Sequence, residues 1–489
     1  MIKKNSIAKN IFHLFYSTVL ANILNATTLI ILANYFNAKN YGMFSVALSL
    51  SMVMNFCTDL GVSNTFLREG SKKEKLDAQF TSYLKIRLIC LIFTVFLFTV
   101  GIHMLYQQQE ILHMIYSLLF PMLIGLTMQS IGITYFQLME RMQFIAFIKI
   151  ITSIVLIISI ILCMALNVDV HLAATLYGTS YLMGGLCSLY LVRRFTKIVW
   201  KSPFQKQLLK KLSPFLLSGL LMMLIPQIGP LVLEKTLAIT LVGLFAVSYR
   251  IPSALYQIPG VIAGAFFPML FKQYNQGDLK EHARLNILQM KIMSLMGMGM
   301  TISIFYLAAY LVTVLFGDEW GDAVELLKIL SFIIVLQGFN IAIADGLTTR
   351  GLQSRRTIVQ FTTIVFGIMS LYFLSLTYAV VGAAYAVVIM ESISFIGYVI
   401  ANPIRRTVIK RVVLPYGTYF SLSFLFVHFF LNAYPFIAMC LTIILILTMV
   451  YLLDQTFKNL IADFLSKRKQ HKTNYGTDGR HKQYGKIAK

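Results

Sequence analysis

Long apolar stretches separated by short polar connections dominate the chain. The apolar runs reach about 20 residues or more, the length that a helix needs to cross the hydrocarbon core of a bilayer. Such runs must be helical, because an open strand cannot satisfy its backbone hydrogen-bonding groups in lipid. The pattern predicts fourteen spans, at residues 10–34, 41–65, 80–106, 112–137, 143–166, 170–192, 213–234, 241–270, 287–316, 324–349, 357–378, 380–401, 412–431 and 434–454. Twelve spans stay open as an alternative if two of these runs are re-entrant.

Composition agrees with a membrane protein. Of the 489 residues, 58% are hydrophobic and only 12% are charged, and the mean hydropathy is +0.75. A soluble domain has about 45–50% apolar and about 25% charged residues. A soluble enzyme, a disordered scaffold and a nucleic-acid-binding protein are therefore excluded, although the net charge is +23. We expect an all-α polytopic membrane protein.

Basic residues alternate between the two sides of these spans. Of the 42 Lys and Arg residues, 38 fall in alternate connections and in the two ends of the chain. The opposite connections contain little beyond Lys39, Lys235 and an acidic stretch at 316–322. Because basic residues collect on the cytoplasmic side, this pattern predicts two cytoplasmic termini and an even number of spans. The connections are too short to hold a folded domain.

A short motif occurs twice, six spans apart. Tyr41-Gly42-Met43-Phe44-Ser45-Val46 opens the second span, and Val242-Gly243-Leu244-Phe245-Ala246-Val247 opens the eighth. An even offset predicts parallel repeats related by an axis along the membrane normal. We therefore expect two pseudo-symmetric six-helix lobes, at 1–200 and 201–405, an appended helix pair at 406–455 and a basic cytoplasmic tail at 456–489.

Arg250 is the main candidate for a binding residue. It lies inside the eighth span, in a stretch that also contains Pro252, Pro259 and Gly260. Ionisable groups inside spans are costly and tend to be functional, and proline bends a transmembrane helix. A permanent cation at a bend that faces a cavity suits an anionic substrate, because guanidinium binds phosphate bidentately. The alternative is a structural pair between Arg250 and an acidic residue of another span.

Other polar residues in the spans are candidates for ion coupling, gating or binding. Glu391 lies near the middle of the twelfth span, where it needs a proton, a cation such as Na⁺, or a partner such as Arg250. Asp59 and Asp345 lie near inner span ends, and the pair Glu234–Lys235 closes the seventh span on the outer side. Each of these has a structural role as its alternative. Asn25, in the first span, is a further binding candidate. We predict no metal site and no cofactor beyond H⁺ or Na⁺, since the five cysteines lie in apolar runs without a C-x-x-C motif.

These residues resemble a known group. The stretches Asn40-Tyr41-Gly42-Met43-Phe44, Thr58-Asp59-Leu60-Gly61-Val62 and Leu67-Arg68-Glu69 are similar to the opening of bacterial polysaccharide flippases. The segments 231–235 and 242–245 continue this likeness, and the stretch 250–268 is similar to the eighth span of lipid II and O-antigen flippases. All belong to the multidrug/oligosaccharidyl-lipid/polysaccharide exporter superfamily. The first span lacks the intramembrane Arg or Lys of the lipid II branch, which favours a capsule, O-antigen or teichuronic-type repeat unit as substrate.

The resemblance implies a flippase with a cationic cavity between two lobes, and no enzyme activity. Its substrate would be an undecaprenyl-diphosphate-linked oligosaccharide, moved from the inner to the outer leaflet of the bacterial plasma membrane by alternating access. Arg250 would bind the diphosphate, Lys235 and Asn25 would assist, and Arg68 would act at the inner gate. Partners would be membrane lipids, a polysaccharide polymerase and glycosyltransferases, with no nucleic acid.

Two other functions stay open at this stage. A cation-coupled drug or metabolite exporter of the same superfamily would need an acidic cavity, against which Arg250 argues. A membrane glycosyltransferase or polymerase is the enzyme alternative. Such enzymes usually carry catalytic groups on a large outer loop, and the outer connections here are short.

Overall fold

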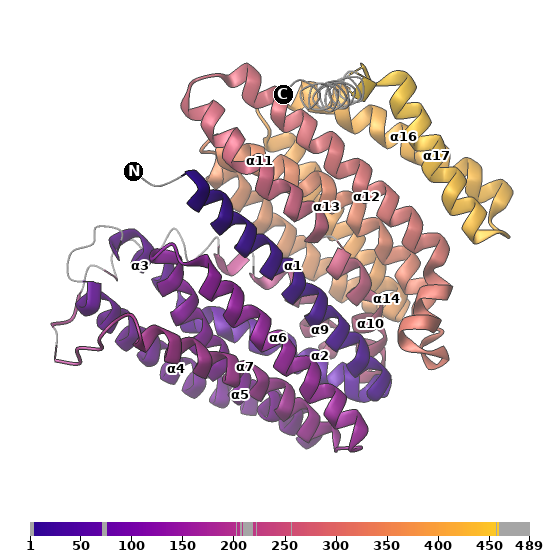
Figure 1. The fold of residues 1–489 in the computed structure, drawn as a ribbon. Helices are drawn as coiled ribbons and strands as arrows, with labels where there is room; N and C mark the ends of the chain where they lie inside the picture. The colour runs from indigo at the N-terminus through magenta and orange to yellow at the C-terminus, as the bar shows by residue number, and fades with distance from the viewer. Residues whose placement is uncertain are drawn as a thin grey trace, which may run out of the picture. The chain divides into compact units, whose positions relative to one another are not determined.

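The computed structural model describes residues 4–70, 76–201, 203–205, 208, 219–221, 223–255, 257–455 and 457–458. Within these residues the secondary structure consists of helices without a strand, and eleven helices are long and apolar enough to cross a membrane. The predicted fold class, an all-α polytopic membrane protein, is confirmed (Figure 1). By its internal contacts the chain divides into two compact units, Met1–Arg405 and Arg406–Lys489.

The helix boundaries explain why eleven is smaller than fourteen. One 49-residue helix covers the predicted spans 357–378 and 380–401, and its backbone leaves helical geometry between them, at Tyr378 and Ala379. The predicted span 170–192 is a 24-residue helix that is not among the eleven. Of the predicted span 213–234, only residues 219–221 and 223–234 are described. The predicted tail beyond residue 458 lies outside the described residues.

The first half of unit 1 is built from seven helices. They are α1 (Lys4–Tyr35), α2 (Ala38–Asp59), α3 (Val62–Gly70), α4 (Leu76–Leu105), α5 (Gln109–Leu138), α6 (Met142–Ala165) and α7 (Val170–Arg193). The indigo-to-magenta ribbon of Figure 1 traces them. α5 packs along α7, and α1 packs along α6 and also touches α10 and α12 of the second half. We call the end of unit 1 that carries the basic connections the inner end, and the opposite end the outer end.

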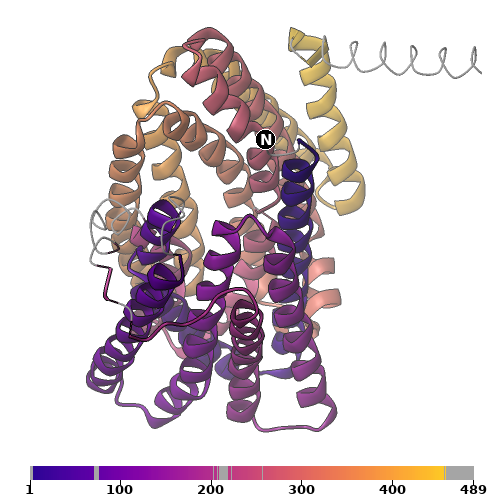
Figure 2. The same cartoon turned by 60° about the vertical axis from the view of Figure 1, so that its left-hand side comes forward.

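The second half of unit 1 repeats this design. Its helices are α9 (Ile228–Thr236), α10 (Ile239–Leu255), α11 (Gln257–Asn275), α12 (Leu279–Phe316), α13 (Ala323–Thr349) and α14 (Gln353–Ala401), preceded by a 3₁₀ turn at Ile225–Gln227. α13 packs on α12, α14 and α10, and α10 packs on α2 (Figure 2). The predicted span 241–270 lies within one candidate membrane span, Ile239–Asn275, which contains α10 and α11.

The second predicted span is shorter than the hydropathy suggests. Residues 41–65 were predicted as one helix, but α2 ends at Asp59 and α3 starts at Val62. Between them Leu60 (φ 46°) and Gly61 (φ 78°) both adopt the left-handed conformation, which ends an α-helix. The prediction was wrong here because the apolar run continues across the break, although Gly61 is a common helix-stop residue.

The connection between the two halves lies against the inner end of the first half. Trp200 O accepts a hydrogen bond from Lys85 Nζ at 2.6 Å, and Val199 N donates to Thr81 Oγ1 at 3.0 Å. Leu208 is buried, and its carbonyl oxygen accepts from Thr65 Oγ1 of α3 at 2.8 Å. In its described part the connection therefore packs against the first half through hydrogen bonds and a buried leucine.

Unit 2 is a helix pair. After α15 (Arg405–Val408), a π-helical turn at Ile409–Val413 leads into α16 (Leu414–Leu431), and α17 (Pro435–Leu453) packs along it. The buried Tyr416 hydroxyl donates a hydrogen bond to Asp454 Oδ2 at 2.9 Å, which fixes the start of α16 to the end of α17.

Candidate functional site

The two copies of the repeated motif meet at the outer end of unit 1, where α2 packs against α10. A Cβ built on Gly42 would lie 2.1 Å from the Ile239 carbonyl oxygen, and one built on Gly243 would lie 2.0 Å from the Ala38 carbonyl oxygen. Only residues without a Cβ permit two backbones to approach this closely. The repeat therefore forms a reciprocal contact between the two halves, which we call the outer seal.

Aromatic side chains surround the outer seal. Tyr41 and Trp320 meet edge to face with ring centroids 6.0 Å apart, and Phe44 meets Tyr177 in the same way at 5.1 Å. All four side chains are buried. Because such rings pack densely and bury large apolar areas, the outer end of the interface between the halves is closed in this structure.

Arg250 lies on the inner side of this seal. At 1.5 Å per residue it is about 10 Å further along α10 than Gly243. The half-buried guanidinium donates a hydrogen bond to the Tyr41 hydroxyl, and the phenols of Tyr177 and Tyr249 lie nearby. Its Nε is buried without a hydrogen-bond partner among the described residues.

The structure answers the alternative reading of Arg250. No ion pair of the described chain includes it. The structural pair with an acidic residue, including the one considered with Glu391, therefore does not occur in the described part of the protein. Arg250 keeps a positive charge among neutral phenols, with donor capacity left for an anion.

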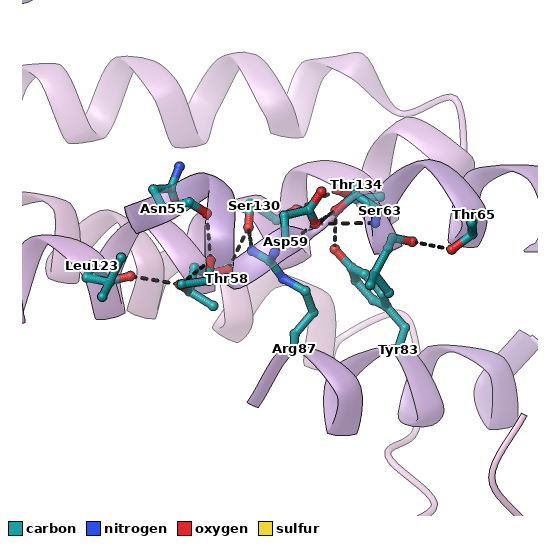
Figure 3. Close-up of polar contacts among 12 residues, drawn as sticks. Asn55, Thr58, Asp59, Ser63, Thr65, Tyr83, Arg87, Leu123, Ser130 and Thr134 are labelled. Carbon is teal, nitrogen blue, oxygen red and sulfur yellow. Dashed lines mark hydrogen bonds and ion pairs between the residues drawn. The ribbon is translucent and has the colours of Figure 1, made fainter. Parts of the chain in front are cut away.

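Asp59 belongs to a buried polar network at the inner end of the first half (Figure 3). Arg87 reaches from α4 and forms an ion pair with Asp59 at 2.7 Å between NH1 and Oδ1, and its NH2 donates to Ser130 of α5. Arg87 is fully buried. Asp59 also accepts from the Ser63 backbone N at 3.2 Å, and so caps the start of α3. The network thus ties the break between α2 and α3 to α4 and α5.

Glu391 is buried on α14 and is held by uncharged donors. Gln337 Nε2 donates to Glu391 Oε1 at 2.7 Å, and Asn340 Nδ2 donates to Oε2 at 2.9 Å. Both amides belong to α13. The Asn340 Oδ1 atom is buried beside them without a partner among the described residues. The Glu391 carboxylate can release one of its amide donors and bind a proton or a small cation instead. The buried Asn340 Oδ1 atom could then accept from that proton or coordinate that cation.

Asp345 lies in a second network, at the inner end of the second half. Gln289 Nε2 of α12 donates to Asp345 Oδ2 at 2.8 Å, and Thr349 Oγ1 donates to the Asp345 carbonyl oxygen at 2.8 Å. Thr349 also meets His282 Nε2 at 2.9 Å, and Arg350 Nε donates to His282 Nδ1 at 3.2 Å. Asp345 therefore joins α12 to α13 and is not aimed at Arg250 or Glu391.

Glu234 and Lys235 form a cluster with Tyr106 at the outer end. The Lys235 ammonium lies 3.0 Å from Glu234 Oε2 and 4.0 Å from the centroid of the Tyr106 ring. The Tyr106 hydroxyl shares a hydrogen bond with Glu234. This cluster contacts the end of α4 through the Leu105 carbonyl oxygen, at 3.4 Å from Lys235 Nζ. The structure separates these candidates from Arg250 and connects them to the first half.

The remaining candidates are less informative. Asn25 is half-buried on α1 and makes no hydrogen bond within the described residues. Arg68 is part of α3, and its side chain lies outside the described residues. Both stay predictions.

Two basic residues were missed because they were counted with the inner connections. Arg87 lies eleven residues inside α4, and Lys149 of α6 donates to Thr18 Oγ1 of α1 at 3.2 Å. Their depth within the predicted spans 80–106 and 143–166 was the available signal. His282 joins the network of Asp345 through Thr349.

The fold is that of the transporters of the MOP superfamily. A solved structure described as "Lipid II flippase MurJ, inward closed conformation" matches at TM-score 0.72 and 13% identity, covering 92% of this chain and 99% of that one. An inward-facing multidrug resistance MATE family transporter matches at TM-score 0.69 and 17% identity, over 80% and 96% of the two chains. An outward-facing structure of that class matches at 0.56 and 16% identity, over 80% and 94%. The better agreement with the inward forms accords with a closed outer seal.

The chain belongs to the family described as "Polysaccharide biosynthesis protein", whose sequence model matches residues 7–274. Among curated protein sequences, none matches it. The predicted relation to polysaccharide biosynthesis proteins is therefore confirmed, and so is the two-lobed transporter fold.

Proposed function

We propose that the protein translocates an undecaprenyl-diphosphate-linked oligosaccharide from the inner to the outer leaflet of the bacterial plasma membrane by alternating access, with both termini in the cytoplasm. Family membership supports a place in polysaccharide biosynthesis, and the fold supports transport by two lobes that open in turn. Glycosyltransferases would supply the substrate, and a polymerase would consume it. The repeat unit is of the capsule, O-antigen or teichuronic type.

The single observation that carries this proposal is the state of Arg250. A diphosphate cannot cross hydrocarbon unaided, because burying unpaired charge costs several kcal/mol per ion. Arg250 offers a permanent cation inside the membrane, on the inner side of a closed outer seal and without a carboxylate partner among the described residues. Its hydrogen bond to Tyr41 has an uncharged acceptor, the phenol oxygen. An entering diphosphate would replace that bond with bonds in which donor and acceptor are both charged.

Tyr41 connects this binding step with gating. It lies next to Gly42 of the outer seal, and its ring contacts Trp320. A substrate that draws the guanidinium away from Tyr41 would loosen the aromatic packing beside the seal. Binding of the anion and opening of the outer end would thus be linked through one side chain.

Ion coupling through Glu391 completes the proposal, with Glu234 as the second candidate. Glu391 is buried and held by neutral amides, so that H⁺ or Na⁺ binding would change the charge of the second half without breaking an ion pair. Glu234 already faces Lys235 at 3.0 Å and has less capacity for a cation. Collapsing both ion gradients should slow translocation, and unchanged rates would exclude coupling.

The experiment that tests the function is a leaflet-translocation assay on the purified full-length protein in liposomes. A fluorescent undecaprenyl-diphosphate oligosaccharide is the probe, and a membrane-impermeant quencher reports its leaflet. Arg250→Ala should abolish translocation, and Arg250→Lys should retain only part of it, because an ammonium cannot bind bidentately. The matched control is Arg284→Ala, since Arg284 is exposed and pairs with Glu281 at 2.6 Å. Wild-type rates in Arg250→Ala would refute the assignment.

A cation exporter of the same superfamily is the second candidate. The observation in its favour is the buried Glu391, which lacks a basic partner among the described residues. In that case Glu391→Gln would abolish efflux of a cationic dye, while Arg250→Ala would leave efflux intact. If the protein is a flippase, neither the wild type nor these two variants should export the dye.

A further inference from the structure

A pocket lies on the second half of unit 1, apart from the outer seal and from Arg250. It encloses about 330 Å³ between α12, α13 and α14. Its lining combines three aromatic residues, two oppositely charged residues and two aliphatic ones: Phe305, Phe332, Tyr385, Glu325, Lys328, Ile329 and Val388. The volume lies within the range of small-molecule sites, at about 300–1,000 Å³.

The two charged residues of the pocket lie near the outer end of α13. Glu325 is in the first turn of α13, and Lys328 follows one turn later on the same face. Neither takes part in an ion pair of the described chain. The Lys328 ammonium instead lies over the Phe305 ring, 5.9 Å from its centroid. At 1.5 Å per residue, Phe305 is about 16 Å below the outer end of α12. A lysine near a helix end normally extends to the interface. The Lys328 ammonium turned toward the pocket instead can bind an anion there.

The surface around the pocket faces lipid. Tyr310 and Val314 on α12 and Ile389 on α14 are exposed apolar side chains of membrane-spanning helices. The outer ends of the two halves are closed at the seal, so exposed apolar residues at this level meet acyl chains rather than a central cavity. A ligand that enters here comes from the bilayer.

The order of the charges along α13 identifies the kind of lipid. Glu325 is nearest the membrane surface, and Lys328 is about 4.5 Å deeper, three residues further at 1.5 Å each. In a zwitterionic phospholipid the ammonium is outermost, and the phosphate, joined to the glycerol, lies deeper. The two charges of the site thus match the two charges of that headgroup in sign and in order. An anionic lipid without an ammonium would leave Glu325 facing a phosphate of like charge.

We propose that this pocket binds the headgroup of a zwitterionic phospholipid, with the phosphate at Lys328 and the ammonium at Glu325. Phe305, Phe332 and Tyr385 contact the glycerol and the first part of one acyl chain. The lipid bridges α12, α13 and α14, the helices that hold Glu391 and its amide donors. The site does not depend on the proposed transport substrate.

The test measures binding of short-chain phospholipids to the purified full-length protein in detergent, by native mass spectrometry or thermal shift. Dioctanoyl phosphatidylethanolamine and phosphatidylcholine should bind about tenfold more tightly than phosphatidylglycerol, the factor of one lost charge-assisted hydrogen bond. Preference for the first over the second identifies a primary ammonium, and equal binding a generic zwitterion. Both support the proposal, whereas equal binding of all three lipids overturns it.

Substitutions of the two pocket charges should change lipid affinity in opposite directions, which misfolding would not do. Lys328→Met should weaken the binding of all three lipids about tenfold. Glu325→Gln should tighten phosphatidylglycerol, a gain that a damaged protein would not show. The matched control replaces the exposed ion pair Lys39–Glu110 at the same end of the fold, as Lys39→Met with Glu110→Gln, and should keep the wild-type preference. Unchanged binding in both pocket variants, or displacement of the lipid by a free disaccharide, refutes the site.

Discussion

Gly243 makes a close backbone contact between the two halves, and an added methyl group there tests the outer seal directly. A Cβ at this position would lie 2.0 Å from the Ala38 carbonyl oxygen and 3.0 Å from Gly42 N. Ordinary C···O contacts are about 3.3 Å. Because the new Cβ would lie 2.0 Å from the Ala38 oxygen, Gly243→Ala must push α10 and α2 apart by about 1.3 Å. Overpacking of this kind costs about 1–3 kcal/mol. Since the acceptor is backbone, no rotamer change relieves the clash.

The cost falls only on the conformation in which the seal is closed. In alternating access the outer ends separate, so the open state lacks this contact. A penalty of about 1–3 kcal/mol shifts the equilibrium about 5- to 150-fold toward the outward-open state. The helical propensity that alanine adds stabilises both states equally and does not enter the shift.

Spin labels at Lys39 and Thr240, both exposed near the seal, report the opening by pulsed electron paramagnetic resonance in a cysteine-free background. Gly243→Ala should add a population at longer distance, and Gly42→Ala should do the same. The matched control is Gly299→Ala on α12, where a Cβ meets nothing within 4 Å. Distance distributions for Gly243→Ala and Gly299→Ala that both equal the wild type would refute the reasoning.

Three further outcomes follow from the buried polar groups. Asp59→Asn should lower the free energy of unfolding by about 3–5 kcal/mol, because Arg87 is left buried without a carboxylate; thermal unfolding in detergent measures this. The double variant Asp59→Leu with Arg87→Met should recover most of that loss, and a double variant less stable than Asp59→Asn would contradict a desolvation origin. Glu391→Gln should make translocation in liposomes independent of H⁺ and Na⁺ gradients while the probe still binds, and a gradient effect that survives would assign coupling elsewhere.

Hydropathy and charge placement predicted most of the fold. The break between the spans ending at 378 and starting at 380 occurs where the backbone leaves helical geometry at Tyr378 and Ala379. The repeated motif indicated two parallel halves, and the structure places Gly42 against Gly243. Both features are local in sequence, so a sequence can reveal them. The break at Leu60 was missed because the apolar run continues through it, although Gly61 is a helix-stop signal. That Asp59 accepts from Ser63 N beyond the break depends on the folded geometry.

The partners of the candidate residues were harder to predict than the residues themselves. Arg250 and Glu391 stand out in sequence because charge is rare in a span. Their neighbours are phenols and amides on other helices, such as Tyr41 and Gln337. Such uncharged residues are common in membrane proteins and carry no distinctive spacing. Arg87 was overlooked because its charge was counted with the basic residues of the neighbouring inner connection.

The partners nevertheless separate structural charges from functional ones. In a low-dielectric interior, an ion pair such as Arg87–Asp59 balances both charges and cannot be broken without losing stability. Among the described residues, Arg250 and Glu391 have only neutral partners, so each keeps a charge that a substrate or an ion can engage while the fold stays intact. Loss of Asp59 should therefore reduce stability first and transport as a consequence. Loss of Arg250 should abolish transport without lowering the unfolding temperature. If the Asp59 and Arg250 variants lost stability and transport alike, the chemistry of the partners would not distinguish structural from functional charges.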